Sequence, residues 1–324
     1  MYNCEVWTIL TNKKLEDKNL ITSSDKAIFE TLNLNMCKYL LGVRKNASNL
    51  ASRGEIGRYP LLLDFLRHSY NFRDRISQMD GSLVKDAFME SSNLGPSSWA
   101  NLLKDLPAKL SCFNSDSSLN VAKLHQLYSN CWLKSLNDSE KLDTLASVKH
   151  EFKLEKYVIS LPKHLRKDLA KLRTSSHPLE VEVGRYHRPY VERNKRLCKI
   201  CNNGEVEDEH HFLTSCSFYK AEKRDILSQL ETHNLNLTHL FNTVFGMNQD
   251  NPILIRISCL FVKSISEKRS EYSRSNPDTS RFTPTVTRYG RVSRPPQRLM
   301  MEITYHLSTI STINVFHFKE QQMY

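Results

Sequence analysis

Cysteine and histidine are concentrated in one short part of the chain, residues 197–219, which reads LCKICNNGEVEDEHHFLTSCSFY. Cys198 and Cys201 are separated by two residues, a spacing that suits adjacent corners of a metal tetrahedron. A histidine and Cys216 follow close enough to close the site. Three thiolates and one imidazole favour Zn(II), and four protein ligands leave no coordination position open for catalysis. We therefore expect a structural zinc site formed by Cys198, Cys201, His211 and Cys216.

Two adjacent histidines, His210 and His211, compete for the third ligand position. On a continuous α-helix, His211 and Cys216 would lie about 140° apart, because each residue advances by about 100°. We expect a short irregular segment between them that turns both side chains toward one ion. The acidic residues 207–209 are expected to form a solvated turn or to favour the N-terminus of the following helix.

The chain carries a formal net charge of +11 at pH 7, which makes polyanions its natural partners. Residues 185–199 set many cations against the single acid Glu192, with aromatic rings interleaved. Cations beside flat rings suit a surface that tracks phosphates and stacks on bases. We predict that RNA or DNA, single-stranded or structured, contacts Arg173, His177, Arg185, Tyr186, Arg188, Arg193, Lys195 and Arg196. The alternatives are a solvated basic loop, an ion pair between Arg185 and Glu182, and a backbone hydrogen bond of His177.

The composition predicts a folded protein of a reducing compartment. With 324 residues and 40% hydrophobic content, the chain can bury a core and form two or three domains. Eight cysteines are too few for a disulfide scaffold of this length, and those outside the zinc site occur singly. The first residues show no basic leader or cleavage-type site, and no run of about 18 apolar residues is present. We expect a soluble intracellular protein, in the nucleus or the cytoplasm, with no membrane partner.

Apolar residues recur at helical spacing through most of the chain, so we expect a mainly α fold. The predicted helices are 25–41, ending at Gly42; 61–79, starting after Pro60; 119–136; one capped by Asp138 or Ser139 and extending to about Tyr157; 163–173; 218–230; and 254–265. A short strand is expected at 180–183, where acidic and apolar residues alternate. Loops are expected at 91–98 and 111–118. Trp7, Trp99 and Trp132 are expected in the core.

A second basic stretch, residues 263–298, is also rich in Ser, Thr and Pro. Such a segment has too little apolar surface to offset its ordering entropy, so we expect a flexible cationic arm. A plain linker is the alternative. Residues 303–318 are β-branched and aromatic without clear periodicity, and they carry no functional interpretation.

Four blocks of the sequence resemble, in order, the C-terminal part of the reverse-transcriptase polyprotein of LINE-type, non-LTR retrotransposons. The blocks are YNCEVW (2–7), similar to the family's YGSEVW; CKYLLGVRKNASNLASRGEIGRYPL (37–61); LAKLRTSSHPLEVEVGRYHRP (169–189); and ERNKRLCKICNNGEVEDEHHFLTSC (192–216). The last is similar to the family pattern ERLCxLCxxGEVEDExHFLxxC. On this resemblance His211 occupies the position of the family histidine, whereas His210 falls where aromatic residues are usual.

The resemblance implies a helical thumb-flanking and connecting region at 1–160 and a domain with a CCHC zinc knuckle at 161–270. In such elements this part is understood to hold template RNA and target DNA. The composition predicts a flexible basic tail at 271–324. Reverse transcription needs paired carboxylates that hold two metal ions, and this sequence has no adjacent Asp pair. We therefore expect the catalytic core to be missing and the chain not to be an enzyme.

A second hypothesis places the working surface elsewhere. In it the chain is a protein-interaction module, or a decayed element-derived module without function. Helices within residues 25–157 would contact a protein partner, and the zinc site would only stabilise the fold. Retained zinc without affinity for RNA or DNA would support this hypothesis.

Overall fold

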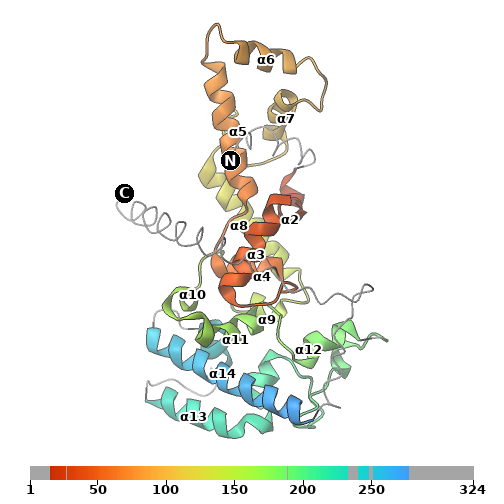
Figure 1. Cartoon of the computed structure of the whole chain (residues 1–324), viewed down its shortest axis with the longest axis vertical. Helices are drawn as coiled ribbons and strands as arrows, with labels where there is room; N and C mark the ends of the chain where they lie inside the picture. Colours follow the sequence, from red (N-terminus) through yellow and green to blue (C-terminus); the bar gives the residue numbers. More distant parts are fainter. Residues whose placement is uncertain (1–14, 27, 188, 233–239, 248–250, 277–324) are drawn as a thin grey trace, which may run out of the picture. The chain divides into compact units, whose positions relative to one another are not determined.

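The computed structural model describes residues 15–26, 28–187, 189–232, 240–247 and 251–276 (Figure 1). Predictions for the block at 2–7, Trp7, Arg188 and the tail beyond 276 lie outside these residues. The described residues up to Ser275 belong to one compact unit. Within them the fold is mainly α, as predicted, and β-structure is limited to three isolated bridges. None of the helices described is long and apolar enough to cross a membrane.

The first part of the unit consists of helices joined by short turns. They are α2 (Leu20–Lys26), α3 (Ile28–Leu41), α4 (Asn49–Ile56), α5 (Leu61–Ser77), α6 (Leu83–Ser91), α7 (Trp99–Asp105) and α8 (Val121–Asn137). α3 ends at Gly42, whose φ of +77° is reached at little cost only without a side chain. Pro60 is the N-cap of α5 and Asn120 caps α8 through its side chain. The helices predicted around these positions are confirmed.

A first hydrophobic cluster, called here the N-terminal cluster, is formed by residues of these helices. Its largest members are Tyr70, Trp99, Tyr128 and Trp132. Trp132 is fully buried, and its indole Nε1 donates a hydrogen bond of 2.9 Å to the Leu50 carbonyl. A Cβ at Gly54 would lie 2.3 Å from Trp132 Cζ2, so α4 can approach α8 this closely only with glycine there. Trp99 and Trp132 are core residues, as predicted.

The second part contains shorter elements and one long helix. They are α9 (Asp143–Ala146), α10 (Lys156–Ser160), α11 (Lys163–Arg173), α12 (Glu180–Val183), α13 (Lys220–Glu231) and α14 (Pro252–Ser275). α11 and α14 lie side by side (Figure 1). The predicted helices 163–173, 218–230 and 254–265 are confirmed. The second hydrophobic cluster, called here the C-terminal cluster, includes Phe212, Leu213, Phe245, Cys259 and Val262.

Three sequence predictions in this part are wrong. The helix expected to extend to Tyr157 is interrupted between α9 and α10, where Leu154 forms a β-bridge with Ile56 and the Glu155 amide donates to the Glu55 carbonyl. The strand expected at 180–183 is the helical turn α12, whose four residues are all buried. The basic stretch is helical up to Ser275, because α14 buries Phe261, Ile265 and Arg269 among other residues.

Candidate metal centre

The side chains of Cys198, Cys201, His211 and Cys216 converge on one point. Their ligand atoms all lie within 4.8 Å of one another. Cys201 Sγ lies 3.4 Å from His211 Nε2. A zinc tetrahedron with ordinary Zn–S and Zn–N bonds places such a pair about 3.6 Å apart. All but Cys201, which is half-buried, are buried. Donor chemistry and spacing therefore both fit a closed metal site.

The first pair of ligands comes from a tight β-like turn. Leu197 and Val206 form an antiparallel bridge, and the Cys198 amide donates to the Glu205 carbonyl at 2.9 Å. The chain reverses direction between them, and Gly204 adopts a φ of +74° there. This reversal holds Cys198 and Cys201 against the segment that carries the other two ligands.

The second pair comes from a π-helical turn, His211–Ser215. The Cys216 amide donates to the His211 carbonyl at 2.8 Å, closing the turn across five residues. A π turn contains one more residue than an α turn, so residues five apart point the same way. The structure thus replaces the expected irregular segment with a regular but rare one. Asp208 stabilises its start, since Asp208 Oδ1 accepts a 2.8 Å hydrogen bond from the His211 amide.

The structure distinguishes His211 from His210. His211 Nδ1 lies 2.6 Å from Glu205 Oε2, which fixes the ring and leaves Nε2 facing the cysteines. Such carboxylate contacts to a metal-bound histidine are common outside the ligand set. His210 is exposed, contacts Thr214 and packs near Phe241. Only His211 belongs to the cluster.

The ligands interact strongly with one another. A hydrogen bond with Cys216, together with burial, raises the pKa of the Cys198 thiol to about 12. The same contact lowers the pKa of the Cys216 thiol. A hydrogen bond with Cys198 raises the pKa of His211 to about 9. Because a metal binds thiolates and neutral imidazole, an ion entering this site displaces protons from these groups.

Glu207 and Glu209 beside the site are buried, so the solvated turn is wrong for them, whereas Asp208 accepts from the amide at the start of the following π turn, which is the predicted alternative. Glu207 forms an ion pair with Arg269 of α14 and accepts a 2.9 Å hydrogen bond from the Glu180 amide. Glu209 Oε1 contacts His177 Nε2 at 2.9 Å, and its Oε2 accepts a 3.0 Å hydrogen bond from Thr144. These pairs join the metal segment to α14, α12 and α9.

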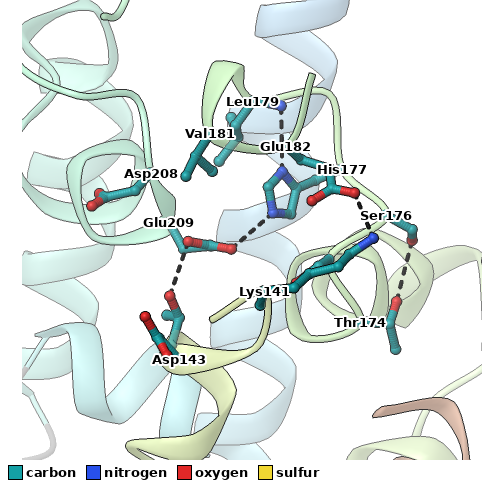
Figure 2. A network of polar contacts seen from close by, with 12 residues as sticks. Lys141, Asp143, Thr174, Ser176, His177, Leu179, Val181, Glu182, Asp208 and Glu209 are labelled. Carbon is teal, nitrogen blue, oxygen red and sulfur yellow. Dashed lines mark hydrogen bonds and ion pairs between the residues drawn. The ribbon is translucent and has the colours of Figure 1, made fainter. Parts of the chain in front are cut away.

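Three predicted nucleic-acid contacts are buried, and the structure corrects that prediction for them. Figure 2 shows His177 between Glu209 and the amide of Leu179. The guanidinium of Arg173 donates to both carboxylate oxygens of Glu55, at 2.8 and 3.0 Å. Arg196 donates to the carbonyls of Val181 and Val191. All three side chains satisfy internal acceptors, so they are unavailable to phosphates.

The other predicted contacts within the described residues are at least partly exposed, but their charges have acidic neighbours. Arg185 Nε lies 3.2 Å from Glu182 Oε2, which is the predicted alternative for this residue. Arg193 pairs with Asp143 at 3.6 Å and Lys195 with Glu192 at 3.1 Å. Tyr186 is 57% exposed and offers a free ring surface. Arg188 lies outside the described residues.

Sequence reasoning missed the residues that support the ligands. Glu205 is one of them, although an acid near a metal-bound histidine is a recognisable signal. Arg269 gave no signal, because its partner Glu207 lies 62 residues away in sequence. Lys223 was also missed; it is buried and donates a 2.6 Å hydrogen bond to the carbonyl of Cys216.

Comparison of the chain with protein-family models, with curated proteins and with solved structures finds no match.

Proposed function

We propose that the chain is a nucleic-acid-binding part of a LINE-type reverse-transcriptase polyprotein, with a structural zinc ion and without polymerase chemistry. The observation that carries this proposal is the convergence of Cys198, Cys201, His211 and Cys216 within 4.8 Å. These residues belong to the block with the strongest resemblance to that family. Because the sequence contains no adjacent Asp pair, we propose no phosphoryl transfer for it.

The four ligands would hold Zn(II), which supplies a tetrahedral cross-link between the two turns that carry them. The segment needs such a cross-link because it buries few apolar side chains, chiefly Phe212 and Leu213. Zinc in small sites supplies an apparent ~10–16 kcal/mol near neutral pH. The buried ion pair between Glu207 and Arg269 connects this segment to α14.

Binding of RNA or DNA is supported by the net charge of +11 and by the exposed rings next to the metal segment. Tyr186 and Tyr190 are 57% and 65% exposed. The ion pairs of Arg193 and Lys195 are on the surface. Exposed ion pairs contribute only about 0–1 kcal/mol, so a phosphate can replace the carboxylate in them.

The test combines metal analysis with a titration of the purified chain by a single-stranded RNA at two salt concentrations. We expect one zinc per chain and an affinity that falls as salt rises. Cys198→Ser should lose zinc and the part of the binding that depends on the surface beside the metal segment. Affinity that depends on neither salt nor zinc would reject the proposal.

A protein-interaction role is the second candidate, and one observation favours it. No residue of α6 is buried, and Leu83, Val84 and Met89 of this helix are exposed, as is Leu94 after it. Exposed apolar side chains gathered on one element are typical of protein-binding surfaces. One bound zinc without any RNA or DNA affinity in the titration above would favour this role.

A further inference from the structure

The turn after α3 and the first turns of α11 bring several cations together. A Cβ at Gly42 would lie 3.0 Å from Lys163 Cε and 3.1 Å from Lys167 Cβ, so both lysines adjoin this turn. Arg44 and Lys45 follow shortly after Gly42 and are exposed. These residues come from two parts of the sequence about 120 positions apart, and only the fold joins them.

The buried side chain of Lys38 fixes the shape of this turn. The Lys38 ammonium donates to the carbonyl of Lys45 at 2.7 Å and to Asn49 Oδ1 at 2.6 Å. Lys38 is buried, so its charge adds to the positive potential without reaching the surface. The positive end of the α11 dipole, which begins at Lys163, adds a charge of the same sign.

These cations differ from those of residues 185–199 in having no acidic partner. In the described part of the chain, none of Arg44, Lys45, Lys163 and Lys167 has a carboxylate oxygen within 4.0 Å. Asp168, which follows Lys167 on α11, pairs with Lys171 at 2.7 Å, and Asp25 is held by the buried guanidinium of Arg53. Partial burial and the neighbouring Arg166 lower the pKa of Lys163.

An aromatic ring completes the surface. Tyr39 of α3 is 56% exposed, and Lys163 Nζ lies 3.8 Å from its ring centroid. Because this ammonium lies over one face of the ring, a base can stack on the other face while the ammonium contacts the adjoining phosphate. Only a base that is not paired inside a duplex presents its face for such stacking.

We infer that Tyr39, Arg44, Lys45, Lys163 and Lys167 form a binding surface for a single-stranded nucleic acid, separate from the metal segment. The inference rests on the proposed function for the class of ligand, but it assigns the contact to α3 and α11. The lysines and arginine neutralise backbone phosphates, and Tyr39 stacks on one base. The surface binds without sequence preference, because every base has a face on which a ring can stack.

The experiment measures binding of a fluorescent 20-nucleotide single-stranded RNA, and of DNA with the same sequence, to the full chain over a range of salt. Losing two phosphate contacts to a single strand lowers the salt slope by about 1.4 and the affinity by about 25-fold at 0.1 M salt. We expect this for the double variant Lys163→Gln with Lys167→Gln. The matched control, Lys123→Gln with Lys134→Gln, removes the same charge from exposed positions of α8 and should bind like the wild type.

Tyr39 provides a separate readout. Tyr39→Leu should weaken binding about fivefold or more with an unchanged salt slope, whereas Tyr39→Phe should bind normally. A duplex of the same sequence should be insensitive to Tyr39→Leu. Circular dichroism and thermal melting of each variant confirm that the helices are intact.

The outcomes separate this inference from the proposed function. If the wild type binds RNA or DNA but both double variants bind equally well, the inference is overturned and the proposed function stands. If neither nucleic acid binds the wild type, both fail. The same titration with polyglutamate represents an acidic protein. If polyglutamate alone binds, and Lys163→Gln with Lys167→Gln abolishes that binding, the surface binds an acidic protein and the inference is again wrong.

Discussion

The N-terminal cluster and the metal segment at 197–216 are stabilised by different means. In the N-terminal cluster, large buried rings such as Trp132 and Tyr128 fill the space between long helices. The metal segment has a bridge, a π turn, a few apolar side chains and the buried ion pair of Glu207 with Arg269, and its four ligand side chains could hold an ion. On the proposed function, one region resists unfolding mainly through buried area and the other mainly through a bound ion. A change that removes only buried area, or only the ion, should therefore unfold only the region that depends on it.

The largest effect is expected from loss of the ion. Cys198→Ser, or a chelator, removes a contribution of ~10–16 kcal/mol in apparent zinc affinity. Residues 197–216 should lose protection from hydrogen exchange, while α5 and α8 keep theirs. Cys131→Ser, outside the site and half-buried, is the control and should leave both regions protected. Equal loss of protection in both regions would show that they fold as one unit.

The reverse experiment acts on the N-terminal cluster. Trp132→Ala removes a fully buried ring and should lower the free energy of unfolding by about 3–5 kcal/mol. Zinc content of the folded fraction should stay at one per chain. Chemical denaturation followed by circular dichroism measures the change. Leu83→Ala, at a position that is 86% exposed, should show no such loss.

The buried pair of Glu55 and Arg173 links α4 to α11. Glu55→Gln leaves the buried guanidinium of Arg173 with only the 3.7 Å contact to Glu155, which Lys149 also contacts, and should cost about 3–5 kcal/mol near pH 7. Burial raises the pKa of Glu55, but Arg173 and Lys149 outweigh it and hold the pKa below its ordinary value of 4.5. Because the folded pKa is the lower one, this stabilisation is present above about pH 4.5 and is lost as the pH falls through the folded pKa.

Urea denaturation at several pH values tests whether the Glu55–Arg173 pair stabilises the fold in this pH-dependent way. The wild type should lose stability below about pH 4.5 more steeply than Glu55→Gln does. Glu151→Gln, which removes an exposed partner of Lys153, should keep the wild-type profile. Identical acid profiles for the wild type and Glu55→Gln would contradict the role given to this pair.

The smallest effect concerns the residue that orients His211. Glu205→Ala should weaken zinc binding about 10- to 100-fold without changing the number of ions bound. Glu205→Gln, which keeps an oxygen acceptor, should fall between this variant and the wild type. Competition with a zinc-sensitive dye measures the affinity, and Glu192→Ala serves as the control. A normal zinc affinity in Glu205→Ala would show that the ligands bind zinc equally well without the carboxylate beside His211.

Local patterns were enough to predict several of the helices and the cysteine ligands. α11 matches its predicted bounds because Pro162 marks its start and apolar residues recur at helical spacing. The cysteines were found from their spacing and residue type, whereas the choice of His211 over His210 came from the family resemblance. Both predictions depend on residues that are neighbours in sequence, or nearly so.

Contacts between distant residues could not be predicted. Arg173 and Glu55 are separated by 118 positions, so nothing near Arg173 indicates that its charge is already matched. The alternating residues of α12 suggested a strand, but the amides of Glu180 and Val181 are taken by Glu207 instead of by a neighbouring strand. The charge of residues 185–199 was overestimated for the same reason, because Asp143 and Glu180 meet Arg193 and Lys199 only in the fold.

The π turn between His211 and Cys216 makes chain length there as important as residue identity. Inserting one residue within 212–215 would separate His211 and Cys216 by six positions, which neither an α turn nor a π turn places on one face. A deletion would leave them four apart, on one face of an α turn, so the site tolerates a shorter segment better than a longer one. Exposed Ser215 can be exchanged for many residues, whereas an insertion beside it should abolish metal binding.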